Sequence, residues 1–176
     1  MRSFIAVELS EDLKQSIAQI QKQLEQYDVK LVKEKNLHFT LKFLGEIDDK
    51  QIKEVKDKLA HISSDAKPFS ISLNSISAFP NINYMRVIWI GTESQDFINL
   101  HNSVSSALSD IGKPGGTPHL TIARVKSARN KKELTEFVKA NENTVFGKML
   151  VDKISLKKST LTPNGPIYEN IEVFML

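Results

Sequence analysis

Residues 36–45 read Asn-Leu-His-Phe-Thr-Leu-Lys-Phe-Leu-Gly, and residues 118–124 repeat the pattern as Pro-His-Leu-Thr-Ile-Ala-Arg. In both stretches polar and apolar residues alternate around a His-x-Thr motif, which is typical of a half-buried β-strand. Residues two apart on a strand share a face, so each stretch would present an imidazole and a hydroxyl side by side. These two stretches decide both the fold and the functional interpretation.

The segments around the two stretches follow one common plan. Period-two patterns predict strands over residues 4–9, 38–44, 69–78, 84–91, 119–125, 148–158 and 168–175. Helical spacing of apolar residues predicts helices over residues 13–24, 52–62, 97–111 and 130–139. An internal repeat, approximately 1–80 and 84–176, predicts two pseudo-symmetric α+β lobes that face each other across a groove. No linker separates them, so we expect a single bilobal domain over residues 1–176.

Composition excludes several classes of protein. The chain has 176 residues, of which 40% are hydrophobic and 26% charged, with no cysteine and a formal net charge of +3. A disulfide framework and a thiolate zinc site are therefore excluded. No stretch approaches the length of an apolar membrane span. We expect a monomer in the reducing cytoplasm, and its mild basicity is compatible with a polyanionic partner.

The residues that could carry chemistry are the two motif histidines, His38 and His119. Facing each other, one neutral and one protonated imidazole provide concerted acid–base catalysis. Thr40 and Thr121 would then hydrogen-bond phosphate oxygens. The other two histidines lie within helical patterns, which favours packing or surface roles. A zinc site needs further ligands, and no acidic residue occupies a matching place in both repeats, so we predict no metal.

Basic residues flank both motifs and fit a groove that attracts a phosphate backbone. They are Lys33, Lys35, Lys42, Arg124, Lys126, Arg129 and Lys132, whereas for Lys30 and Lys131 we favour solvated loop positions without such a role. Alternation places Lys42 on the His38 face of its strand. Strict alternation places Arg124 on the face opposite His119, so it reaches a bound phosphate only if the strand twists or bulges.

The paired motifs resemble those of the two-histidine phosphoesterase superfamily. The stretches at residues 2–6 (Arg-Ser-Phe-Ile-Ala) and 86–91 (Arg-Val-Ile-Trp-Ile-Gly) also resemble its RNA 2′,3′-cyclic phosphodiesterase branch. Bacterial and archaeal members of that branch were first named 2′-5′ RNA ligases. The resemblance covers residues 1 to about 130 by motif and the remainder by length and element order.

The resemblance implies a bilobal α+β fold, with two antiparallel sheets lining a central cleft and helices outside. It implies metal-independent opening of RNA 2′,3′-cyclic phosphate ends to 2′-phosphates without a cofactor, and a capacity for 2′-5′ joining. The partners would be RNA ends, with tRNA fragments as one source. His38 and His119 would be catalytic, with Thr40, Thr121, Lys42 and Arg124 binding substrate. We assign His119 to activate water and His38 to protonate the leaving 3′ oxygen.

Two alternatives stay open at this point. The substrate could be another cyclic or 2′-5′ linked nucleotide, since the motifs do not distinguish these phosphodiesters. The chain could also be a non-catalytic RNA-binding module that retains the groove. The intact His-x-Thr pairs weigh against the second alternative, because binding alone needs Lys and Arg more than neutral imidazoles.

Overall fold

The computed structural model describes residues 1–176 and contains nine strands, four α-helices and one short 3-10 turn. The strands are β1 (Arg2–Glu8), β2 (Val29–Leu31), β3 (His38–Glu46), β4 (Phe69–Asn81), β5 (Tyr84–Gly91), β6 (Leu120–Val125), β7 (Val145–Val151), β8 (Lys153–Thr162) and β9 (Gly165–Met175). The helices are α1 (Glu11–Leu24), α2 (Asp49–Asp65), α3 (Gln95–Ala107) and α4 (Lys131–Ala140), and the turn is η1 (Glu34–Asn36). The predicted mixed α+β class is confirmed.

All nine strands belong to one antiparallel sheet. Its order is β7-β4-β5-β6-β3-β1-β8-β9, with β2 paired to β6. The central strands β3 and β6 share a single residue pair, Phe39 with Leu120. The expectation of two separate sheets is therefore wrong, because this pairing joins the halves into one continuous sheet. The division into two lobes across a cleft stays a prediction.

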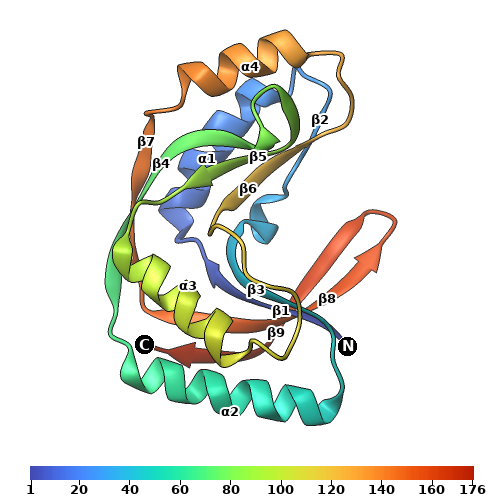
Figure 1. Ribbon diagram of the computed structural model, residues 1–176. Coiled ribbons are helices and arrows are strands. Elements are labelled where there is room, and N and C mark those ends of the chain that lie inside the picture. Colours follow the sequence, from blue (N-terminus) through green and yellow to red (C-terminus); the bar gives the residue numbers. More distant parts are fainter.

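The order of the strands is symmetric about the centre of the sheet, as the predicted internal repeat requires, and the repeat itself stays a prediction. Counted outward from the centre, β6 matches β3, β5 matches β1, β4 matches β8 and β7 matches β9. The repeats also exchange elements, because β4 pairs with β5 and β8 pairs with β1. Likewise α1 packs on β6 and β7, whereas α3 packs on β3. In Figure 1, α1 and α4 accordingly accompany the β4–β7 half of the molecule, and α2 and α3 accompany the other half.

Local sequence explains where several elements begin and end. Asp48 caps α2 through a reciprocal capping box with Gln51. The predicted helix to residue 111 is too long, because α3 ends at Ala107. Beyond it, Gly112 has a positive φ of 79°, and an added Cβ would clash with the backbone oxygen of Phe43. This close approach to β3 requires a turn and a glycine.

The predicted strand over residues 148–158 is two strands. β7 pairs with β4, whereas β8 pairs with β1 and β9, and only Asp152 separates them. The chain therefore crosses from one half of the sheet to the other at this point, which a continuous apolar pattern does not reveal. The three-residue strand β2 was not predicted, because it is too short to show a period.

One cluster of 38 buried apolar residues draws on both halves of the sheet and on all four helices. The fully buried Phe39 and Phe97 illustrate this, since their rings lie 5.0 Å apart and come from different repeats. None of the helices has the length and apolar character needed to cross a membrane.

Candidate active site

The two His-x-Thr motifs meet at the centre of the sheet. Phe39 and Leu120, which form the only pair between β3 and β6, are the middle residues of the two motifs. Both are fully buried on one face. Alternation then places the flanking motif residues together on the other face, where they are half-buried: His38, Thr40, His119 and Thr121. Extending this antiparallel register sets each histidine alongside the threonine of the other motif.

Each motif is followed by the same β-bulge. Consecutive positions of β1 pair with Thr40 and Lys42, which makes Leu41 an extra residue in β3. The pairing of β5 with β6 shifts in the same way at Ile122. A bulge reverses the alternation that follows it. The fourth residue after each histidine therefore turns into the core, and the fifth returns to the histidine face.

The bulge overturns the predicted position of Lys42. Its side chain lies in the core, with the residue 3% exposed, and Nζ donates to the backbone oxygen of Lys113 at 3.0 Å. Burial lowers the pKa of Lys42, which the Asp110 carboxylate partly offsets. Phe43 is on the site face instead, 53% exposed, with its ring 6.2 Å from that of Phe4. The prediction that Lys42 shares the His38 face is therefore wrong.

The second bulge supplies what Arg124 required in order to reach the site. Ala123 takes the buried position, and Arg124 is exposed. Its guanidinium lies close enough for its charge to act on two neighbours. Burial lowers the pKa of His119 and the charge of Arg124 adds to this effect, whereas burial raises the pKa of Tyr168 and the charge of Arg124 offsets part of that rise. Arg124 thus accompanies His119, whereas Phe43 occupies the matching place beside His38.

Both imidazoles are held in the same orientation by the backbone. His38 Nδ1 lies 2.7 Å from the carbonyl oxygen of Asn36, and His119 Nδ1 lies 2.7 Å from that of Thr117. A carbonyl oxygen can only accept, so Nδ1 carries the proton in the neutral ring and Nε2 is left with its lone pair. His38 Nε2 then accepts from the Thr40 hydroxyl at 3.1 Å, while His119 Nε2 has no protein partner.

Each histidine also lies against two aromatic rings. Ring centroids from His38 are 5.0 Å to Phe4 and 5.3 Å to Tyr168, and those from His119 are 4.8 Å to Phe79 and 6.0 Å to Trp89. These rings were not predicted from the sequence as parts of the site. The only sequence signal was that Phe4 and Trp89 fall within the two additional stretches that resemble the phosphodiesterase branch.

This burial depresses the basicity of both histidines. Burial lowers the pKa of His38 from 6.5 to about 4, and the charges of Lys157 and His119 act in the same direction. The hydrogen bond to Asn36 and the charge of Glu8 act against it. Burial also lowers the pKa of His119. Both rings are therefore neutral at pH 7 in the free protein.

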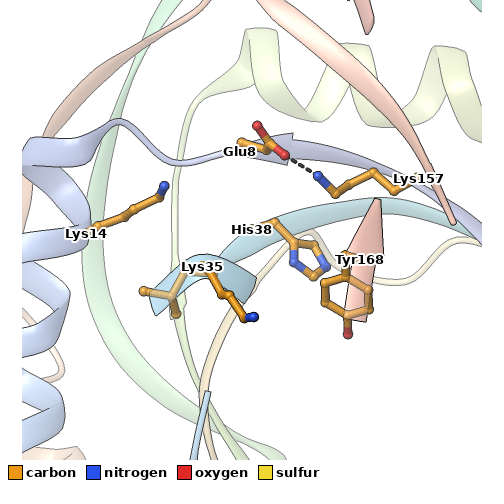
Figure 2. A pocket seen from close by; sticks show the side chains of 7 residues that line it. Glu8, Lys14, Lys35, His38, Lys157 and Tyr168 are labelled. Carbon is orange, nitrogen blue, oxygen red and sulfur yellow. Dashed lines mark hydrogen bonds and ion pairs between the residues drawn. The ribbon is translucent and has the colours of Figure 1, made fainter. Parts of the chain in front are cut away.

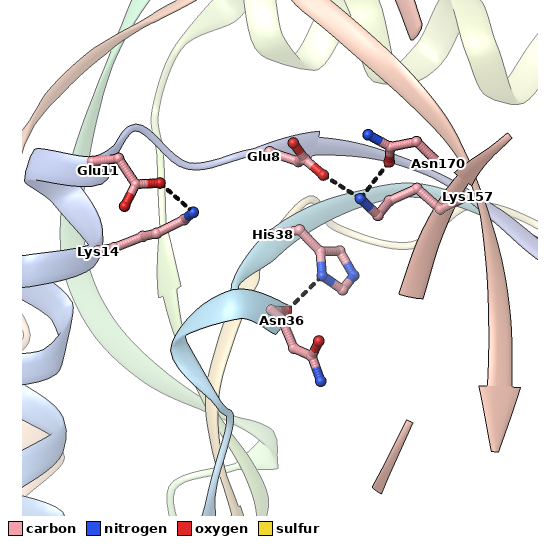
Figure 3. A network of polar contacts seen from close by, with 7 residues as sticks. All are labelled: Glu8, Glu11, Lys14, Asn36, His38, Lys157 and Asn170. Carbon is pink, nitrogen blue, oxygen red and sulfur yellow. Dashed lines mark hydrogen bonds and ion pairs between the residues drawn. The ribbon is translucent and has the colours of Figure 1, made fainter. Parts of the chain in front are cut away.

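A partly buried ion pair lies behind His38. Lys157 Nζ is paired with the Glu8 carboxylate and donates to Asn170 Oδ1 at 2.6 Å (Figure 3). Asn36 connects the same histidine to the β8–β9 hairpin, because its Nδ2 donates to the backbone oxygen of Pro166 at 3.0 Å. The sequence analysis missed this network, whose members are far apart along the chain.

A small pocket of about 60 Å³ opens beside His38 (Figure 2). Its lining consists of Glu8, Lys14, Lys35, Leu37, His38, Lys157 and Tyr168. The remaining histidines are elsewhere, His61 exposed on α2 near Asp65 and His101 buried on α3.

The sequence matches a family of phosphoesterases. The family model described as "LigT like Phosphoesterase" matches residues 7–89 and residues 90–168. An RNA 2′,3′-cyclic phosphodiesterase of Methanocaldococcus jannaschii is 41% identical over 175 residues, which cover 98% of this chain and 99% of that protein. Another, from Methanothermobacter thermautotrophicus, is 38% identical over 182 residues, covering 100% of this chain and 99% of that protein.

Solved structures share the fold. A crystal structure of a Thermus thermophilus protein superposes with a TM-score of 0.87 at 26% identity, covering 100% of this chain and 98% of the other. Escherichia coli LigT complexed with phosphate gives a TM-score of 0.80 at 21% identity, covering 99% of this chain and 96% of the other. The second similarity concerns the fold alone.

Proposed function

The chain belongs to the LigT-like phosphoesterase family, within the two-histidine phosphoesterase superfamily, and we propose that it is an RNA 2′,3′-cyclic phosphodiesterase. The observation that carries this proposal is the central pair Phe39–Leu120, which sets two His-x-Thr motifs side by side on one face. The names of the relatives supply the substrate class, an RNA end that carries a 2′,3′-cyclic phosphate.

In the proposed reaction, water attacks the phosphorus atom and the bond from phosphorus to the 3′ oxygen breaks. His119 Nε2 takes a proton from the water, and His38 Nε2 gives one to the leaving 3′ oxygen. The products are a 2′-phosphate and a free 3′ hydroxyl. Thr40 and Thr121 donate to the non-bridging oxygens, and Arg124 balances the negative charge that develops there.

The division of roles between the histidines rests on their partners. His119 Nε2 has no protein partner and is open to a water molecule, as a base requires. His38 is paired with Thr40 and, with a pKa of about 4, is a strong proton donor once protonated. A bound phosphate anion favours that protonated form, because its negative charge offsets the charge of Lys157.

Further parts of the proposal go beyond the relatives' names. We propose that the reaction needs no metal or cofactor. We also propose that the same residues join RNA ends through a 2′-5′ linkage when the 5′ hydroxyl of a second RNA attacks the phosphorus atom in place of water and the 3′ oxygen leaves. We also propose that the protein acts as a monomer in the cytoplasm, with tRNA fragments among its substrates. The absence of cysteine supports a reducing compartment.

The test is to incubate a short RNA with a terminal 2′,3′-cyclic phosphate in the presence of EDTA and to identify the product by phosphorus NMR. We expect a 2′-phosphate from the native protein and from His61→Ala, whose ring is exposed on α2. We expect no measurable product from His38→Ala or His119→Ala on the same time scale.

The alternatives correspond to other outcomes of this test. Turnover of a different cyclic or 2′-5′ linked nucleotide, with this RNA left intact, would replace the substrate but keep the catalytic pair. Tight RNA binding without turnover, unaffected by either substitution, would show that the protein is a non-catalytic RNA-binding module. A 3′-phosphate product would overturn the assignment of the leaving oxygen.

A further inference from the structure

Three ammonium groups converge on the pocket beside His38. Lys14 reaches it from α1, Lys35 from η1 and Lys157 from β8, as Figure 2 shows. These elements are far apart in the sequence, and the fold brings their side chains to one place. A pocket with so many cations next to a phosphate-handling histidine needs an explanation in terms of a ligand.

The acidic groups nearby do not neutralise the pocket. Glu8 is the only carboxylate in its lining, and it is paired with Lys157. Lys14 is paired at 2.6 Å with Glu11, whose side chain is 76% exposed and does not line the pocket. Lys35 is exposed and forms no hydrogen bond or ion pair. Lys35 therefore contributes an uncompensated positive charge, whereas the charges of Lys14 and Lys157 are offset by Glu11 and Glu8.

The composition and size of the pocket favour a phosphate as its ligand. Its volume, about 60 Å³, is too small for a base, and its lining offers ammonium donors rather than an extended apolar surface. Phosphate oxygens are the acceptors that lysine ammonium groups bind as point charges. The Tyr168 ring, which stands edge-on to His38, also lines the pocket and can contact the sugar or base attached to that phosphate.

Position relative to His38 identifies which phosphate this is. The lining contains no residue of the His119 motif, so the pocket extends the site outward past His38 rather than between the two histidines. In an RNA chain that ends in a cyclic phosphate, the nearest other anion is the phosphodiester that precedes the terminal nucleotide. We propose that this pocket is a subsite for that phosphodiester, which makes the protein selective for oligonucleotide ends over mononucleotides. The proposal rests on the proposed function.

The test isolates one charge in the ligand. Two dinucleotides that both end in a 2′-phosphate, the product form, are compared by their dissociation constants. One has the ordinary linking phosphodiester and the other a neutral methylphosphonate in its place. We expect the native protein to bind the charged dinucleotide about 5- to 10-fold more tightly, as for a phosphate between a few ammonium groups. Lys35→Gln and Lys14→Gln should each reduce this ratio to about 2.

Lys53→Gln is the matched control, because Lys53 is an exposed lysine on α2 that forms no ion pair. It should keep the native ratio. A native ratio near 1, or a ratio that Lys35→Gln and Lys14→Gln leave unchanged, would overturn the subsite. Because binding is measured on products, loss of the proposed catalytic function would appear separately, as a native protein that binds both dinucleotides but turns over no cyclic end.

Discussion

The two halves of the sheet have the same backbone features around their histidines but differ in the charged side chains nearby. In both, a His-x-Thr motif is followed by a bulge, and a carbonyl two residues before the histidine holds Nδ1. The residue that the bulge returns to the site is Phe43 in one half and Arg124 in the other. The two halves thus hold imidazoles in equivalent backbone positions, and the side chains around them make one unlike the other.

The difference extends to the surroundings of each histidine. A partly buried Lys157–Glu8 pair lies behind His38, whereas an exposed guanidinium, that of Arg124, accompanies His119. Acid–base catalysis by two identical groups requires that they differ in protonation when the substrate is bound. The different neighbours of His38 and His119 would therefore make one histidine the acid and the other the base.

Removal of either histidine is the largest expected effect, and it tests what the halves share. Since each general acid or base contributes about 10²–10⁴-fold, His38→Ala and His119→Ala should each raise the barrier by at least roughly 3 kcal/mol. The measurement is kcat on a cyclic-phosphate RNA, with His61→Ala as the control. Losses of similar size would establish equivalence, whereas a loss confined to one histidine would contradict a paired mechanism.

Substitution of the fifth residue after each histidine tests what the two halves do not share. Arg124→Met should lower kcat/KM by about 10²-fold, because it removes a cation from the charge that develops on phosphate. Phe43→Leu at the matching position should change kcat/KM by less than about threefold, since it exchanges one apolar contact for another. Equal effects at the two positions would show that the charge asymmetry has no catalytic role.

The pH dependence gives a finer comparison. In the free protein the pKa of His38 is about 4, and burial also holds the pKa of His119 below 6.5. The acid must be the protonated ring of His38, and its population in the free protein falls about tenfold for each pH unit above its pKa; protonation of His119 at acidic pH removes the base. We therefore expect kcat/KM to peak on the acidic side of pH 6.5 and to fall as pH rises through neutrality. A plateau extending from pH 6 to pH 8 would contradict these environments.

Lys42→Met is the smallest expected change. Lys42 faces the core in the position that Ala123 occupies in the other half. Its loss removes one hydrogen bond to Lys113 and one buried charge, effects that oppose each other, so the free energy of unfolding should change by about 1 kcal/mol. Activity should stay within about twofold. A tenfold loss of kcat/KM in a folded variant would show that Lys42 acts in the site after all.

The sequence predicts those features that depend on period and duplication. The alternation in residues 38–44 and 119–125 predicts β3 and β6. Helical spacing predicts all four helices, and the observed ends lie within a few residues of the predicted ones. The His-x-Thr pairs predicted two motifs that face each other across a groove, but not that their strands pair directly through Phe39 and Leu120. These signals are local or repeated along the chain, so they can be recognised in a single sequence without knowledge of which strands pair.

What the sequence did not predict depends on pairing between distant strands. The bulges at Leu41 and Ile122 leave no mark in an alternating pattern, and they exchanged the positions assigned to Lys42 and Phe43. The break at Asp152 and the exchange of β4 and β8 between the halves are decided by partners elsewhere in the sheet. The pocket lysines come from three separate elements and had no common signal.

The most direct test of the central claim, that the two histidines act together on one step, is kcat for the double variant His38→Ala/His119→Ala. Groups that act as a unit are strongly non-additive. If the histidines act as a unit, kcat of the double variant should be at most about threefold below the lower of the two single-variant values. If the two losses multiply instead, the histidines act independently, and the paired mechanism is contradicted.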